Sequence, residues 1–153
     1  MALARILIVM LVGSSAFAAD EDGVRVNYML NCQGCHLAQA QGVAGKVPKM
    51  KDFVGYFLHS PEGRRFIIRV PGVAYSALDD AEIAALMNWL LRTYSAAQLP
   101  GNFSPYNAGE VAVLRENPEQ DPETTRAVIL GEIAADVPAL AAELARDNRQ
   151  RRR

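Results

Sequence analysis

Cysteine and histidine are scarce in this 153-residue chain, and long apolar runs are missing. Besides the pair Cys32 and Cys35, a structural zinc site needs two more ligands, and away from that pair the only histidine is His59, so such a site needs a carboxylate to complete it. A permanent membrane helix needs about 20 apolar residues, far more than the unbroken run at residues 6–12. No stretch interleaves basic and aromatic residues, so nothing favours nucleic-acid binding.

The first 19 residues have the features of a secretory signal peptide. Arg5 gives a positive start, residues 6–12 are apolar, and Ala16-Phe17-Ala18 lies in a small-residue stretch of the kind that signal peptidase cleaves. An uncleaved N-terminal anchor is the alternative interpretation. We therefore expect export to the periplasm and a mature chain that begins near residue 20.

The most specific pattern in the chain is Cys32-Gln33-Gly34-Cys35-His36. This spacing is typical of covalent attachment of haem c, in which both thiols add to the haem vinyl groups and the histidine binds the iron. A redox dithiol is the alternative, but that chemistry usually follows a β-strand in a βαβ pattern, which the sequence does not show.

Apolar spacing predicts short helices on both sides of this motif. The expected elements are a helix at residues 22–31, a loop at residues 37–48 over one haem face, and helical stretches at residues 49–60 and 65–70. Pro61 would end the first of these two stretches, and Pro71 the second.

The clearest helix signal begins after Asp79. This residue can cap the helix together with Glu82, and an apolar stripe continues to Tyr94. The stripe comprises Ile83, Leu86, Trp89 and Leu90.

Taken together, residues 22–95 resemble a class I cytochrome c, an all-α fold of short helices around one covalently bound haem. The resemblance rests on the attachment motif, on Pro48 and on the final helix with Trp89. It implies that the first and last helices cross with Trp89 in their contact. It also implies that the Pro48 carbonyl accepts a hydrogen bond from His36, which would make the imidazole a stronger iron donor.

One feature departs from that family. Class I cytochromes usually supply a methionine as sixth iron ligand from the loop before the last helix, and residues 70–77 contain neither methionine nor histidine. His59 and Met50 are the remaining candidates, with Met87 a weaker one beside the apolar stripe. An open sixth position is the other possibility, and an iron of that kind binds small ligands or peroxide.

Basic residues cluster after the motif, at Lys46, Lys49, Lys51, Arg64, Arg65 and Arg69. The resemblance places them beside the haem crevice, where they would steer an acidic redox partner. Alternatively, they offset the haem propionates or are simply solvated.

Residues 96–153 extend beyond the family pattern. We expect a linker that leads away from the last helix, a helix capped by Asn107, another opened by Asp121, and a break at Pro138. This extension either packs on the haem domain of residues 20–95 or contacts a partner subunit. Its basic end, residues 146–153, is either disordered or touches an anionic membrane surface.

These features predict a periplasmic single-electron carrier with one haem c, held by Cys32, Cys35 and His36. Its expected partners are a periplasmic dehydrogenase and a cytochrome or oxidase. The alternatives are a haem subunit of a dehydrogenase complex, and a ligand sensor or weak peroxidase with an open iron.

Overall fold

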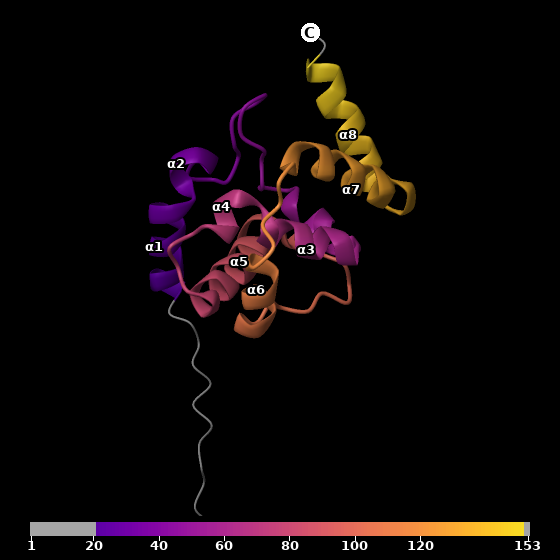
Figure 1. Cartoon of the computed structure of the whole chain (residues 1–153). Helices are drawn as coiled ribbons and strands as arrows, with labels where there is room; N and C mark the ends of the chain where they lie inside the picture. The colour runs from indigo at the N-terminus through magenta and orange to yellow at the C-terminus, as the bar shows by residue number, and fades with distance from the viewer. Residues whose placement is uncertain (1–20, 152–153) are drawn as a thin grey trace, which may run out of the picture.

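The structure is a computed structural model that describes residues 21–151, so the predicted signal peptide lies outside the described residues. Over this range the chain is helical, and its only strand-like pairing is an isolated bridge between Val43 and Val47. The helices are α1 (Glu21–Asn31), α2 (Gln33–His36), η1 (Val54–His59), α3 (Pro61–Arg69), α4 (Pro71–Ala74), α5 (Asp80–Tyr94), η2 (Ala96–Gln98), α6 (Ala108–Arg115), α7 (Pro122–Asp136) and α8 (Pro138–Arg151), as Figure 1 shows. The all-α prediction is confirmed.

Helices α1 and α5 pack against each other as predicted. The Tyr28 ring of α1 lies 5.6 Å from the Trp89 ring and 5.6 Å from the Tyr94 ring, both on α5. The predicted capping box is present, because Asp79 accepts from the backbone N–H of Glu82 and the Glu82 side chain accepts from that of Asp79. This contact fixes the C-terminal end of α1, from which α2 continues.

Two predictions about this part of the chain were wrong. Residues 49–60 do not form the predicted helix over their whole length, and Pro61 does not end a helix. The stretch is a series of turns followed by the short 3-10 helix η1, and Pro61 begins α3 instead of ending a helix. Ser60 accepts from the Gly63 N–H, so α3 has an N-cap followed by proline at the first turn, an arrangement that favours a helix start. Pro71 likewise begins α4.

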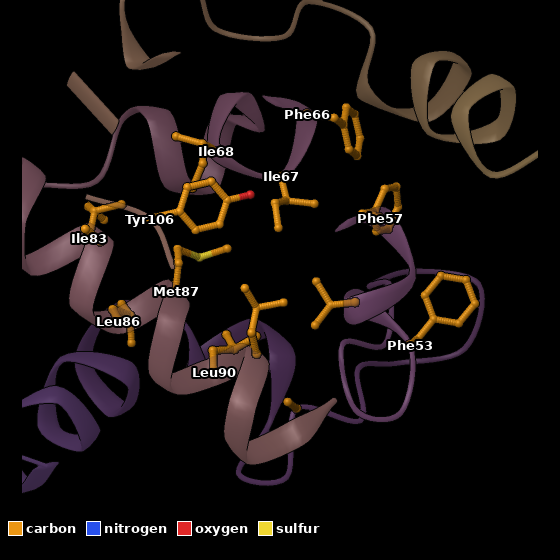
Figure 2. Close-up of a cluster of buried hydrophobic side chains, with 14 of the residues drawn as sticks. Phe53, Phe57, Phe66, Ile67, Ile68, Ile83, Leu86, Met87, Leu90 and Tyr106 are labelled. Atoms are coloured by element: carbon orange, nitrogen blue, oxygen red, sulfur yellow. The ribbon is translucent and has the colours of Figure 1, made fainter. Parts of the chain in front are cut away.

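One apolar core joins η1, α3 and α5 (Figure 2). Its large members from these elements are Phe57, Phe66, Ile67, Ile68, Ile83, Leu86, Met87, Leu90 and Leu91. In Figure 2 the side chains of Ile67 and Met87 turn toward Tyr106, which comes from the C-terminal extension.

The extension is part of this same core. Its buried side chains are Tyr106, Val111, Ile129, Leu130, Ile133 and Leu140. The linker does not lead away from α5 as predicted, because the Tyr106 N–H donates to Asn88 Oδ1 and Asn88 Nδ2 donates to the Tyr106 carbonyl. Of the two roles considered for the extension, packing on the haem domain is therefore the one that the structure shows.

Polar contacts reinforce this packing around Arg64. Its guanidinium donates to both carboxylate oxygens of Glu110, at 2.6 and 2.7 Å, and stacks 4.0 Å from the Tyr106 ring centre. The Tyr106 hydroxyl donates to the Arg64 carbonyl at 2.7 Å. The predicted caps at Asn107 and Asp121 and the break at Pro138 are also confirmed. Residues 146–151 belong to α8, so this part of the basic end is helical and not disordered.

We expect acid to weaken the attachment of α8. Glu143 accepts hydrogen bonds from Lys49 and Arg146, which hold its pKa below the usual range. A carboxyl group with a lowered folded-state pKa stabilises the fold above its unfolded-state pKa, and that stability is lost as pH falls through the folded-state value. The pair is partly solvated, so the effect at neutral pH is no more than about 1 kcal/mol.

Measuring the free energy of unfolding against pH for wild type and Glu143→Gln tests this expectation. Wild type should be the more stable at neutral pH, and the difference should close in acid. If the difference in free energy of unfolding between the two proteins stayed constant at every pH, the expectation would be contradicted.

Candidate functional site

The two cysteines and His36 lie on a single helical turn. The backbone N–H groups of Cys35 and His36 both donate to the Cys32 carbonyl, at 3.2 and 2.9 Å. Residues three apart in a helix lie on the same side, so the turn directs both thiols to one edge. Both thiols are free, with Cys35 exposed and Cys32 partly buried against the core, and burial raises the pKa of Cys32.

The imidazole of His36 is held as the family resemblance implied. Its Nδ1 donates to the Pro48 carbonyl at 3.1 Å, which leaves Nε2 available as a metal ligand. Burial lowers the pKa of His36, while the bond to Pro48 acts in the opposite direction. A neutral imidazole is the form that binds metals, so the geometry suits an axial iron ligand.

Two tyrosines fix the loop that carries Pro48, a role that the sequence analysis missed. The Tyr28 hydroxyl donates to the Leu37 carbonyl at 2.6 Å, and the Tyr94 hydroxyl donates to the Ala38 carbonyl at 3.0 Å. Burial and the nearby Tyr94 raise the pKa of Tyr28 to about 12, so it remains a donor over the physiological range. The sequence shows that a tyrosine can donate a hydrogen bond, but every residue has a backbone carbonyl, so the sequence does not indicate which carbonyl accepts it.

Gly42 allows the loop to close on itself. Its N–H donates to the His36 carbonyl at 3.1 Å, and its φ of +65° is in the left-handed region. A Cβ at this position would lie 2.4 Å from the Val47 carbonyl oxygen and 2.8 Å from that of Pro48. The oxygen that accepts from His36 is therefore placed where a side chain at residue 42 would displace it.

Gly42→Ala is expected to destabilise the protein by about 1–3 kcal/mol and to shift the reduction potential, because the Pro48 carbonyl must move away from His36. Gly45→Ala is a matched control, since Gly45 also has a positive φ of +71° but no atom within 4 Å of the place that an added methyl group would take. Chemical denaturation and a redox titration measure both effects. Equal potentials in the two variants would show that the bond does not depend on Gly42.

Two of the three predicted candidates for a sixth ligand have other contacts, and for the third, Met50, only a backbone bond is seen. His59 Nε2 lies 3.0 Å from the Gln98 carbonyl, and His59 lines a cavity of about 520 Å³ that contains neither cysteine nor His36. Met50 follows Pro48 closely, and its N–H donates to the Ala40 carbonyl. Met87 is buried in the core, with 5% of its surface exposed. No iron-ligand role for any of them follows from these contacts.

Carboxylates neutralise most of the predicted basic rim. Four of its six side chains form ion pairs, which are Lys49–Glu143, Arg64–Glu110, Arg65–Glu62 and Arg69–Glu119. Lys46 and Lys51 remain exposed. Three of the four partner carboxylates come from the extension, so local charge counting in the sequence overestimated the positive potential.

Other metal chemistries find no support in the described residues. From residue 21 to residue 151 no group of three or more histidine, cysteine, aspartate or glutamate side chains could hold a metal ion, so the zinc alternative lacks its ligands. Within the same range no β-strand precedes the cysteine pair, as the dithiol alternative would require.

Comparison with known proteins gives the family. The chain is 30% identical over 124 residues to a cytochrome c-552 of Thermus thermophilus, an alignment that covers 69% of this chain and 82% of the relative. The chain belongs to the c-type cytochromes. A second cytochrome c-552 of Thermus thermophilus is also 30% identical, over 112 residues that cover 61% of this chain and 84% of the relative. No protein-family model matches the chain.

As a c-type cytochrome, this protein carries covalently bound haem c with its iron. The described residues fit that group, because two free thiols and an imidazole with Nε2 available lie together on one turn. The alignment spans more of the chain than residues 22–95 alone, so part of the extension is shared with these relatives.

Proposed function

We propose that this c-type cytochrome is a single-electron carrier in the periplasm, with Cys32 and Cys35 as the thioether residues and His36 as an axial iron ligand. The supporting observation is the hydrogen bond from His36 Nδ1 to Pro48, which orients an imidazole directly beside two free thiols. Bound haem supplies a reversible one-electron exchange between ferric and ferrous iron.

The polypeptide has two tasks in this function. The first is to fix the imidazole, which Pro48, Tyr28 and Tyr94 do through the loop bonds described above. The second is to keep one haem edge near the surface. An exposed haem edge would let electrons pass to a partner without direct coordination.

The predicted signal peptide supports a periplasmic location. No helix among residues 21–151 has the length and apolar character to cross a membrane. The proposed electron donor is a periplasmic dehydrogenase or another cytochrome, and the proposed acceptor is a terminal oxidase or bound cytochrome. The neutralised basic rim argues for a partner whose docking depends little on strong negative charge.

A redox titration of the purified mature protein, followed by its absorption spectrum, tests the carrier function. We expect a reversible transition that fits one electron, and electron exchange with a second c-type cytochrome as probe. His36→Ala is expected to lose the low-spin spectrum. An unchanged spectrum in this variant would show that the axial ligand is another residue.

Ligand binding is the second candidate function, favoured by one observation. Residues 70–77 contain no methionine or histidine, His59 Nε2 lies against the Gln98 carbonyl, and Met87 is buried in the core. An iron with an open position binds carbon monoxide when reduced. Spectra of the reduced protein with and without carbon monoxide distinguish the two functions, because a saturated iron shows no change.

The extension offers little support for the dehydrogenase-subunit alternative. Six of its apolar side chains are buried in the core, so it is not a free arm for docking, although Val113 and Val128 are exposed. A partner subunit would have to bind its outer face.

A further inference from the structure

Arg115, at the end of α6, makes an unusually complete set of bonds to one short segment. Its Nε donates to the Ala74 carbonyl at 3.2 Å, its Nη2 to the Ser76 carbonyl at 2.5 Å, and its Nη1 to the Leu78 carbonyl at 3.0 Å. Nη1 also lies 2.8 Å from Asp80 Oδ1, at the start of α5. The side chain is only 17% exposed, so these bonds form with little competing water.

The guanidinium supplies hydrogen-bond donors to backbone carbonyls between α4 and α5. The 74–78 loop comprises the last residue of α4 and the four non-helical residues that follow, and its alternate carbonyls converge on this single side chain. Within the segment, the Ser76 hydroxyl accepts from the Leu78 N–H at 3.3 Å. A rigid planar fork matches several carbonyls at once, whereas a lysine ammonium acts as a point charge. Removing Arg115 would leave these carbonyls without their donors.

We propose that Arg115 is a positioning residue that holds the 74–78 loop closed over the sixth coordination position and so limits the access of external ligands to the iron. This inference rests on the proposed function and on the resemblance, which places the loop before the last helix against the haem face opposite His36. The loop offers no methionine or histidine of its own, so its closed position is the barrier that an incoming ligand meets.

Arg69 provides a matched control on the same part of the extension. Its Nε donates to the Asn117 carbonyl at 2.5 Å, and its Nη2 lies 3.8 Å from Glu119. Both arginines therefore join the haem domain to the segment around residues 115–119, but Arg69 lies on α3 and bonds to no carbonyl of the 74–78 loop. A general loosening of the extension would affect both variants, whereas loss of loop positioning would affect Arg115 alone.

The test is the rate of carbon monoxide binding to the reduced holoprotein, measured by stopped-flow absorption. Arg115→Met is expected to bind about tenfold faster than wild type, equivalent to about 1.4 kcal/mol in the loop equilibrium, or to gain binding if wild type shows none. Arg69→Met should match wild type, and Arg115→Lys should recover part of the barrier through Asp80. Equal rates in Arg115→Met and Arg69→Met would overturn the proposal.

Amide hydrogen exchange gives a readout that does not depend on haem. Exchange at residues 75–78 should accelerate in Arg115→Met and remain unchanged in Arg69→Met. If exchange accelerates but the carbon monoxide rate does not, the loop is held by Arg115 but does not cover the iron, which overturns the proposal and leaves the carrier function intact. Failure of the carrier function itself would show separately, as loss of haem attachment in the wild-type protein.

Discussion

A chain with serine at both Cys32 and Cys35 is expected to leave a haem-competent exporting host without covalently bound haem. The reason is chemical, because a hydroxyl does not form the thioether that joins the polypeptide to the haem vinyl groups. Neither cysteine forms a disulfide bond, so the double substitution removes no disulfide that could account for a change in the protein. The expected result is complete loss of haem, seen as the mass of the bare mature polypeptide and as absence of haem after denaturing electrophoresis.

Gln33→Ala serves as the control for this experiment, because it alters the same turn and leaves both thiols in place. It should retain one haem per chain. Covalent haem in the double serine variant would show that the attachment residues lie elsewhere, and the assignment of His36 would then lose its basis.

A chain that stops at Ser95 is expected not to fold. Truncation removes six buried side chains from the common core, among them Tyr106, Leu130 and Leu140. Emptying the place of a single large core side chain costs about 2–5 kcal/mol, whereas a whole domain is stable by about 5–15 kcal/mol. Circular dichroism and thermal unfolding of the haem-loaded protein should therefore show loss of the cooperative transition.

A chain that stops at Asn148 is the matched control. It loses part of the basic end but keeps every one of the buried side chains of the extension, so its unfolding midpoint should be close to that of wild type. A cooperative transition in the chain ending at Ser95, with the wild-type midpoint, would contradict the common core and support the predicted domain boundary near residue 96.

Local signals in the sequence predicted the parts of the fold that depend on neighbouring residues. The attachment motif, the caps at Asp79 and Asn107, and the break at Pro138 are all decided within a few positions. Pro61 shows the limit of such signals, because proline suits a helix start as well as a stop, and only the Ser60 cap distinguishes the two.

Long-range contacts account for what the sequence did not predict. Arg64 and Glu110 are 46 positions apart, and nothing in either local context indicates that they pair. The same holds for Tyr94 and the Ala38 carbonyl, which are 56 positions apart. The resemblance did predict the bond from His36 to Pro48, because it carries information about tertiary contacts that periodicity does not contain.

The ion pair between Lys49 and Glu143 has a consequence for biosynthesis. It joins the residue after Pro48 to the last helix, 94 positions later in the chain. Residue 49 is synthesised long before residue 143, so the segment after Pro48 gains this partner only once α8 has been made. The contacts of this segment are therefore not complete while the chain is still growing toward α8.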